Sequence, residues 1–525
     1  MQERQPSLSS IDQYTKTDQI MKRELLYNLF TALFVLSLMG ACQTEKEVRD
    51  VEVFHLEGDL DTTVFQQAPF EWRITPRYDY SKVFVTKLFL CQAEYDKDYL
   101  GAYKTCDNGK QTVYMTCEQA LEAIKGMDAI TLGLPKIVYL VGWQYNGHDS
   151  KYPALFEGNK AIKRDCDEDA LQSIRWLMEE AKKYHTVVSL HINLYDAYTD
   201  SPLFDQYVKA DVLARDKDGK LIHGDWGYKV SYAAEWEKGL VQVRLDSLCK
   251  LLPIQEAGTI HIDAFHNNVP RPYLVDGKPV IKFESPISPW HGYTNEQEIE
   301  AKKNIIKYLD SKGIDVTTEG IWNMSMDDIK EGYFPMYWHF NSLQHIMSLK
   351  ASQACGGNSY GAVCAFGNNV NAEQLFRSTP NLADAFEVFK KEFCKTTLIC
   401  QYLNTFGREM LVADKNGNGI GVMDDGLRTM YRDGKTYVAK DGEMLAEGGD
   451  IFIPAKWLGD HAIVAYSEQG CEERTWTIPA GTKLGRKTKA WLISDKGRSE
   501  FRNFSKSRNS ITLSLEPGEM VLFTD

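Results

Sequence analysis

The chain lacks the excess of positive charge that binding to nucleic acid requires. Its 525 residues carry a formal net charge of −13, with an isoelectric point near 5.5, whereas nucleic-acid binding needs clustered lysine and arginine. Global disorder is excluded as well, because 43% of the residues are hydrophobic and 12% are aromatic. An acidic chain that is rich in aromatic residues suits a neutral partner.

The apolar run near the N-terminus, Leu25–Met39, is too short for a comfortable membrane span. It follows two basic residues and precedes "GAC", an order that predicts a signal peptide. The letters "MGAC" resemble a bacterial lipobox, whose cysteine is acylated. We therefore expect residues 1–42 to be an extension plus a lipoprotein signal peptide, with Met21 as the true start. Cys42 would anchor an exported protein at the outer membrane, cell surface or periplasm, with no other membrane contact. A plain secretory signal is the alternative.

Paired metal-ligand motifs are also missing. The eleven cysteines include Cys42 and are otherwise scattered, with no CxxC pair. The histidines 148, 191, 261 and 266 lack i, i+4 spacing, so we expect no catalytic metal and no cofactor. A structural calcium site in "DKNGNGIGVMDD", through Asp414, Asn416, Asn418 and Asp425, is a weaker interpretation than an Asn-Gly hairpin turn.

The length of the chain predicts several domains. Residues 43–115 read as a tether and a small β-rich segment whose fold the pattern leaves open. Residues 116–405 repeat a helix-then-strand unit, which is typical of parallel strands joined by crossovers and favours a (β/α)8 TIM-like barrel. Residues 406–525 alternate short apolar strands with turns such as "RDGK" and "KDGE", and predict a β-sandwich.

Three of the expected strands obey one rule, which favours a barrel over an open sheet. Every second residue is apolar and would face the outer helices, and the residues between them are polar and would face inward. An open sheet buried on both faces would not tolerate such polar rows. The inward rows are Ser189–His191–Asn193, Thr259–His261–Asp263 and Asp315–Thr317–Glu319.

Two of these rows end in a carboxylate. Asp263 and Glu319 would reach the same rim of the barrel, at the carboxyl ends of the strands, where barrel active sites lie. Two carboxylates at one cavity are what glycoside hydrolysis requires. The alternative for each residue taken alone is a helix cap or an ion pair with lysine.

Four motifs resemble the catalytic barrel of glycoside hydrolase family 101, the endo-α-N-acetylgalactosaminidases, and of the related exo-acting family 129. They are "VYLVGWQYNGHDSKYPA", "VVSLHINLYDAYTDSPLFD", "IHIDAFHNN" and "VTTEG", in that order. The tail from "IFIPAKW" onward is similar to the β-sandwich that follows the family's barrel. The resemblance covers residues 130–525 in pieces.

The resemblance implies a role for each matching residue. Asp263 corresponds to the nucleophile and Glu319 to the general acid/base of a retaining enzyme that releases Gal-β1,3-GalNAc from Ser or Thr of mucin-type glycoproteins. The residues expected to bind the substrate are His148, Asp149, His191, Asn193, Trp226, His261, Asn267 and Trp322.

The chain departs from the family pattern between the two carboxylates. The segment after Asp263 is long, and "DAFHNN" replaces the usual aromatic-Gly-Asn continuation. Gly320 stands where the family has Trp, for which Trp322 is a candidate replacement. Four residues of the long segment are expected to rebuild subsites: Arg271, Tyr273, Trp290 and His291.

Two rival functions follow from these departures. One is an exo-acting α-N-acetylgalactosaminidase or α-galactosidase on the same barrel. The other is a glycan-binding lipoprotein without turnover, against which the presence of both Asp263 and Glu319 argues.

Overall fold

The computed structural model describes residues 54–64, 71–224, 226–265, 273–275, 278–280, 287–319, 330–336, 372–416 and 418–525. For residues 63–64, 273–275, 278–280, 319 and 333–336 it describes only the backbone. The chain divides into two units, Met1–His55 and Leu56–Asp525. All elements below belong to the second unit. None of the helices in the described part is long and apolar enough to cross a membrane.

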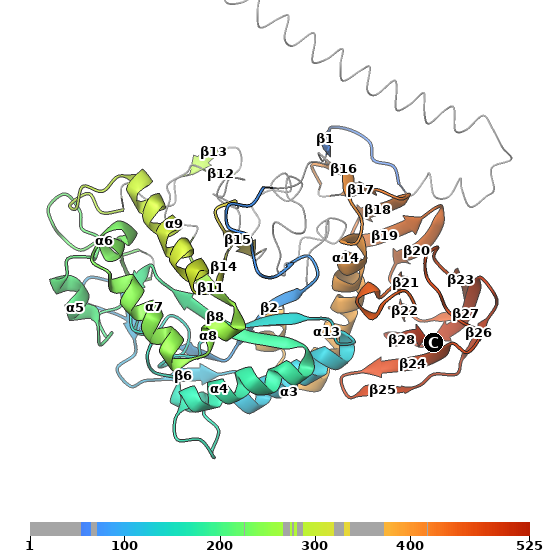
Figure 1. Cartoon of the computed structure of the whole chain (residues 1–525), viewed down its shortest axis with the longest axis horizontal. Helices are drawn as coiled ribbons and strands as arrows, with labels where there is room; N and C mark the ends of the chain where they lie inside the picture. Colours follow the sequence, from blue (N-terminus) through green and yellow to red (C-terminus); the bar gives the residue numbers. More distant parts are fainter. Residues whose placement is uncertain are drawn as a thin grey trace, which may run out of the picture. The chain divides into compact units, whose positions relative to one another are not determined.

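A six-stranded parallel sheet carries the first half of this unit (Figure 1). Each strand lies beside the one that precedes it along the chain, and all neighbours run parallel. This order is that of a barrel and not of a doubly wound sheet, whose strand order reverses. The strands are β2 (Phe84–Phe89), β7 (Lys136–Val141), β8 (Thr186–Asn193), β11 (Thr259–Asp263), β14 (Asp315–Glu319) and β15 (Tyr333–Met336).

The sheet curves so that its inner side chains meet. Tyr139 on β7 reaches across β8 and lies 2.6 Å, hydroxyl to hydroxyl, from Thr259 on β11. The sequence expectation of polar inward rows is therefore confirmed. Closure into an eight-stranded barrel stays a prediction, because residues 337–371 lie outside the described residues.

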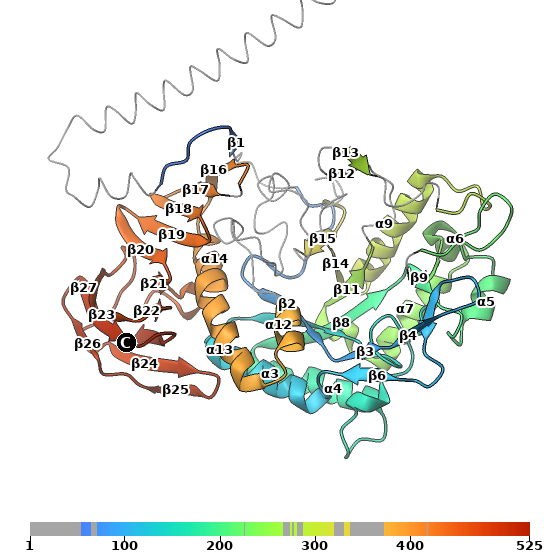
Figure 2. The same cartoon turned by 180° about the vertical axis from the view of Figure 1, so that it is seen from behind.

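Helices pack against the apolar face of the sheet, as the strand pattern predicts (Figures 1 and 2). Leu190 and Ile192 of β8 share a core with Ile174 and Leu177, which lie on the predicted helical face of residues 170–181. The helices are α3 (Cys117–Ile130), α4 (Ala170–Ala181), α5 (Phe204–Lys209), α6 (Tyr232–Glu237), α7 (Leu240–Leu251), α8 (Ile254–Ala257), α9 (Asn295–Ser311), α12 (Ala372–Ser378), α13 (Leu382–Glu392) and α14 (Leu398–Leu403).

Asn295 and Glu298 have the spacing of a capping box in the sequence, but the capping box of α9 lies one residue earlier. Thr294 is the N-cap, and its partner is Gln297. Asn295 is the first helical residue, and Glu298 faces the interior instead. Gly313 separates α9 from β14: its φ is +84°, a value that favours glycine, and β14 begins two residues later.

The parallel sheet begins before residue 116, the predicted start of the barrel. Its first strand is β2, in which all six residues are buried, so the alternation that marks a half-buried strand is missing. Four short strands follow in two antiparallel pairs before α3: β3 (Cys91–Ala93) with β6 (Gln111–Val113), and β4 (Tyr95–Lys97) with β5 (Tyr103–Thr105).

Residues 43–115 therefore do not form one separate segment. β1 (Leu60–Val64) pairs with β16 (Arg408–Asp414) of the C-terminal region. Two further short pairs are β9 (Asp196–Ala197) with β10 (Tyr228–Lys229), and β12 (Tyr273–Val275) with β13 (Lys278–Val280).

The C-terminal region is all β, as its turn-rich sequence predicts. An eleven-stranded antiparallel sheet faces a three-stranded one, β23-β27-β26, across a core that includes Phe452, Ile463 and Trp476. The strands after β16 are β17 (Gly419–Met423), β18 (Leu427–Arg432), β19 (Lys435–Lys440), β20 (Glu443–Gly448), β21 (Asp450–Pro454), β22 (Ala462–Ser467), β23 (Cys471–Thr477), β24 (Lys489–Ser494), β25 (Gly497–Glu500), β26 (Phe504–Lys506), β27 (Ser510–Leu515) and β28 (Met520–Thr524).

The calcium interpretation does not fit this region. Asp414 accepts hydrogen bonds from the backbone N–H groups of Asn416 and Asn418 and from the Asn418 amide, which is the pattern of a β16–β17 turn. Asp425 follows β17 at its other end and pairs with Lys440. The two carboxylates therefore do not share a site.

Candidate active site

The candidate site lies at the carboxyl ends of β7, β8 and β11. The register of the two central strands places His261 beside His191 and Asp263 beside Asn193. All four side chains come from the inward polar rows. Because the residues are held by a regular ladder, their spacing is fixed by the sheet and not by loops.

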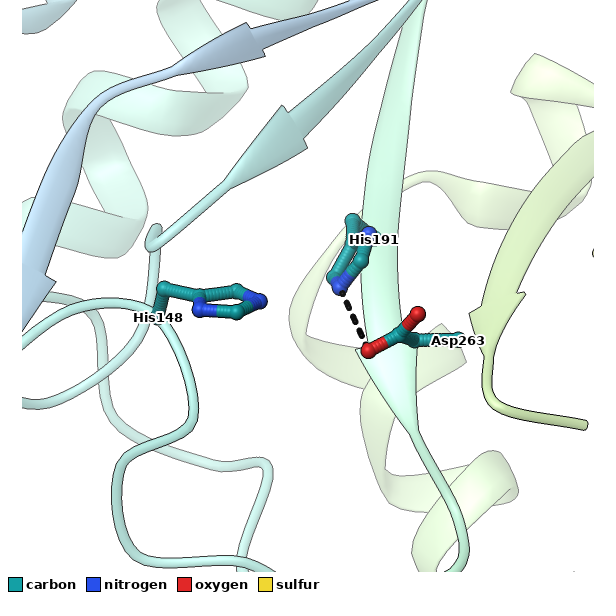
Figure 3. A group of neighbouring side chains, drawn as sticks. All are labelled: His148, His191 and Asp263. Atoms are coloured by element: carbon teal, nitrogen blue, oxygen red, sulfur yellow. Dashed lines mark ion pairs between the residues drawn. The ribbon is translucent and has the colours of Figure 1, made fainter. Parts of the chain in front are cut away.

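Three histidine rings form a row beside Asp263, in which His191 stacks on His261 and is tilted relative to His148. The ring centroids of His148 and His191 are 5.3 Å apart, and those of His191 and His261 are 5.2 Å apart. His261 Nδ1 lies 3.0 Å from the hydroxyl of Thr317 on β14. Asp263 Oδ2 lies 3.6 Å from His191 Nε2, and the Asp263 side chain is 14% exposed (Figure 3). This carboxylate is thus partly exposed to solvent and lies beside an imidazole ring.

The loop after β7 brings His148 and Asp149 to this row of histidines. His148 Nδ1 lies 3.4 Å from Asp149 Oδ2. Asp149 has a φ of +50°, in the left-handed region that a non-glycine residue rarely adopts. Gly147 lies so close to the Cys91 carbonyl that a Cβ would be 2.6 Å from its oxygen, so glycine is required there. The Tyr95 hydroxyl donates to the carbonyl of His148 over 2.6 Å and supports the loop from the β4–β5 hairpin.

Asn193 shapes the chain after β8. Its amide oxygen accepts from the backbone N–H groups of Tyr195 and Asp196, and its amide nitrogen donates to Asp196 Oδ2 over 2.7 Å. Burial, together with the nearby Asp149 carboxylate, raises the pKa of Asp196 to about 8. Asp196 is a buried acid that sequence reasoning missed. Its signal was the position three residues after Asn193, which suits an Asx-type turn.

Trp226 forms an aromatic cluster with the hairpin between β2 and α3. Its ring centroid is 5.1 Å from that of Tyr103 and 5.7 Å from that of Tyr95. The indole is 44% exposed, so one side of the ring is open to a ligand. Since Tyr95 also bonds the His148 carbonyl, the aromatic cluster and the histidine loop are directly linked.

Several expected site residues fall elsewhere. Trp290 and His291 pack on the 211–219 turn: a Cβ on Gly219 would be 3.1 Å from the Trp290 ring, and His291 Nε2 lies 3.4 Å from Asp211. Glu319 ends β14, and only its backbone is described. Tyr273 begins β12, again with its backbone alone. Outside the described residues lie Cys42, Asn267, Arg271, Gly320 and Trp322.

One group of side chains could hold a metal ion. Ligand atoms of His148, His191 and Asp263 all lie within 4.8 Å of one another. Imidazole and carboxylate are ligands that zinc and related ions accept. The expectation of no catalytic metal stays a prediction.

Comparison with known families agrees with the motifs. Residues 111–273 match the family model described as endo-alpha-N-acetylgalactosaminidase, which is glycoside hydrolase family 101. The matched stretch contains His148, His191 and Asp263. It ends within the segment that departs from the family pattern, so Glu319 lies beyond it.

The fold also overlays on solved structures at low identity. They include an alpha-N-acetylgalactosaminidase, NagBb from Bifidobacterium bifidum, in complex with GalNAc, at 13% identity and a TM-score of 0.46, over 69% of this chain and 58% of that one. An alpha-amylase from Geobacillus thermoleovorans overlays at 8% identity and a TM-score of 0.39, over 85% and 99% of the two chains. This chain thus spans less than two thirds of the Bifidobacterium enzyme. Residues 111–273 of this chain are thus similar to glycoside hydrolase family 101, and they contain three of the motifs that resemble it.

Proposed function

We propose that the chain is a retaining glycoside hydrolase that cleaves α-linked GalNAc, as Gal-β1,3-GalNAc, from Ser or Thr of mucin-type O-glycoproteins. Asp263 is the nucleophile and Glu319 is the general acid/base. The observation that carries the proposal is the position of Asp263: a partly exposed carboxylate at the tip of a central parallel strand, beside a row of three histidines.

The backbone supports a pair of carboxylates at retaining distance. β11 and β14 pair in parallel, with Ile262 opposite Thr318. The next residues along the two strands are Asp263 and Glu319. Neighbouring strands lie about 4.8 Å apart, and retaining glycosidases hold their carboxyl groups about 5–5.5 Å apart. Inverting enzymes need a wider gap to admit water between the two groups.

The stereochemistry of the substrate requires a nucleophile from the protein. In α-linked GalNAc the 2-acetamido group is cis to the leaving group, so it cannot attack the anomeric carbon from the opposite face. In the first step, an oxygen of Asp263 bonds to the anomeric carbon as the bond to the Ser/Thr oxygen breaks, and Glu319 gives that oxygen a proton. In the second step, Glu319 takes a proton from water, whose oxygen displaces Asp263 and restores the α configuration.

The surrounding residues suit the binding of a neutral sugar. His148, Asp149 and His191 present hydrogen-bonding groups beside Asp263, and the exposed face of Trp226 offers a surface on which a sugar ring can stack. Export through the signal peptide and acylation of Cys42 would place the enzyme where glycoproteins are found. Metabolic labelling with a fatty acid tests that part: the wild-type chain should incorporate label, and a Cys42→Ser chain should not.

A panel of chromogenic α-linked sugars and a mucin O-glycopeptide tests the proposed activity. We expect release of Gal-β1,3-GalNAc, first as the α anomer by NMR. Release of GalNAc alone would show an exo-acting enzyme, and release of the β anomer would rule out retention. Retained mucin binding without turnover of any sugar would make the chain a glycan-binding protein.

A further inference from the structure

A buried arginine lies behind the loops that carry His148 and His191. Arg244 on α7 donates from Nη1 to the carbonyl of Pro153 over 3.2 Å and from Nη2 to the carbonyl of Leu194 over 3.0 Å. Pro153 follows the His148–Asp149 loop, and Leu194 directly follows Asn193. One guanidinium therefore connects the chain after β7 with the chain after β8.

A buried lysine holds the chain after β11 in a similar way. Lys302 on α9 donates from Nζ to the carbonyl of Phe265 over 2.9 Å. Phe265 lies two residues after Asp263, and the residue between them, Ala264, has a φ of +52°. The left-handed turn at the tip of β11 is thus fixed on its far side by a charged hydrogen bond.

Both cations are linked to α6 through buried glutamates. Glu235 on α6 lies 3.2 Å from Arg244 Nε. Glu298, one turn before Lys302 on α9, accepts from the Ser231 hydroxyl over 2.6 Å and from the backbone N–H of Ala233 over 3.0 Å, at the N-terminus of α6. Side-chain exposure of Arg244 and Glu235 is 5% and 0%. The short helix α6 therefore joins the two anchors.

Stability alone does not explain these groups. A buried ion pair gains little over well-packed apolar residues. Arg244, besides its bond to Glu235, donates to the carbonyls of Pro153 and Leu194. Lys302 donates to the carbonyl of Phe265, and all three carbonyls lie in the chain that follows site residues. A lysine at the other end of the sheet provides the contrast. Lys136, at the start of β7, is buried, pairs with Asp128 over 2.5 Å, and donates to the carbonyl of Leu134 and to the Thr131 hydroxyl. None of these partners adjoins a residue of the candidate site.

We propose that Arg244 and Lys302 are positioning residues, which hold the strand-end backbone of β7, β8 and β11 so that His148, His191 and Asp263 face one substrate. The inference rests on the proposed function, and it adds residues that lie outside the site itself. Arg244 aligns the histidine side with the Asn193 turn, and Lys302 aligns the nucleophile.

The experiment compares matched substitutions at the two ends of the sheet. Lys302→Met keeps the length of the side chain and removes the charged donor, and Lys136→Met does the same away from the site. We expect kcat of K302M to fall by about a hundredfold, the scale of a displacement of about 1 Å in a catalytic group, with KM less affected. K136M should keep kcat per folded molecule, and Lys302→Arg should recover part of the loss.

Arg244→Lys keeps the charge beside Glu235 but cannot reach two carbonyls at once. Its control is Arg215→Lys, because Arg215 also pairs with a carboxylate, Asp211, and donates to a carbonyl, that of Gly219. We expect R244K to lower kcat by about tenfold or more and R215K to leave it unchanged.

Backbone hydrogen exchange provides a readout that does not depend on turnover. Exchange in peptides that cover residues 259–265 should rise in K302M and K302R. Exchange in peptides that cover residues 144–155 and 192–198 should rise in R244K. The controls K136M and R215K should show no rise in these peptides. Unchanged exchange in these peptides, or equal loss of kcat in the matched controls, would overturn the proposal. If K302M does not fold, K302R carries the test. A wild-type chain inactive on all sugars would contradict the proposed function, while hydrogen exchange would still decide whether the two cations hold the strand ends.

Discussion

The two ends of the parallel sheet each carry a carboxylate, but the two carboxylates differ in the hydrogen bonds that they accept. At the amino end, the Asp315 carboxylate accepts from the backbone N–H groups of Arg77 and Tyr78 and from the Tyr80 hydroxyl. At the carboxyl end, the Asp263 carboxylate lies 3.6 Å from His191 Nε2 and accepts no hydrogen bond from the described residues. In the chain that follows β8, the buried hydroxyl of Tyr198 has no hydrogen-bond partner among the described residues.

This difference separates stability from function. A buried polar group with its bonds made stabilises the fold, whereas polar groups left without partners are prepared for a ligand or water. The inward polar rows look alike in the sequence, but Asp263, at the carboxyl end of one row, is partly exposed. It lies at the end of the sheet where barrel enzymes bind their substrates.

Replacing Asp263 and Asp315 with asparagine should give the largest difference between the two ends of the sheet. Asp263→Asn should lower kcat by about 10⁴-fold or more, the scale seen when an enzyme loses its nucleophile, without unfolding the chain. Asp315→Asn should instead cost about 2 kcal/mol of stability and keep activity per folded molecule. Steady-state kinetics and thermal unfolding of both variants measure this. Activity near wild type in D263N, or a loss of kcat in D315N, would break the comparison.

Glu319→Gln should slow the reaction in a way that depends on the leaving group. Removing a general acid costs about 10²–10⁴-fold on a natural O-glycopeptide. An activated aryl glycoside needs no protonation, so its first step should be much less affected. Kinetics with a series of leaving groups measures the difference. Equal losses on natural and activated substrates would exclude Glu319 as the acid.

Trp226→Ala should weaken binding more than chemistry. Loss of a stacking contact of about 1 kcal/mol predicts a rise of about fivefold in KM, with a small change in kcat. Trp290→Ala is the matched control, since Trp290 is 55% exposed but packs on the turn at Gly219. A similar rise of KM in both variants would show that Trp226 has no special contact with the sugar.

The raised pKa of Asp196 predicts that the stability of the fold decreases as the pH rises. Its pKa is raised from 3.8 to about 8 by burial and by the nearby Asp149, so the folded state holds a proton that the unfolded state releases near pH 4. Raising the pH from about 5 to about 8 should therefore destabilise the wild type by about 2 kcal/mol or more relative to Asp196→Asn, which has no proton to lose. Unfolding of both proteins at the two pH values measures the difference. A difference in free energy of unfolding between the two proteins that does not change with pH would contradict the raised pKa of Asp196.

The sequence was sufficient for elements with a clear period. The face of α4, the polar rows of β8, β11 and β14, and the change to short strands after α14 all follow from alternation or helical spacing. β2 was not assigned to the barrel, because a strand buried on both faces has no alternation. The pairing of β1 with β16 joins residues more than 340 positions apart, which local patterns do not encode.

The site could be predicted where function coincides with a strand end. His191, His261 and Asp263 lie where their alternation placed them, and His148 was found through the family motif. Asp196 was missed because its role depends on burial in the folded chain, and Arg244 and Lys302 because they act through carbonyls that are distant in sequence. Trp290 and His291 pack on the 211–219 turn, a contact that the sequence pattern does not encode, and their part in a subsite stays a prediction.

Trapping the covalent intermediate tests the central claim most directly. An activated fluorosugar analogue of α-GalNAc should react with the wild-type enzyme and leave one sugar on the peptide that contains Asp263, identified by mass spectrometry. Label on that peptide, absent from Asp263→Asn, is the predicted result. Label on another carboxylate would contradict the account, as would turnover of the analogue to an inverted product.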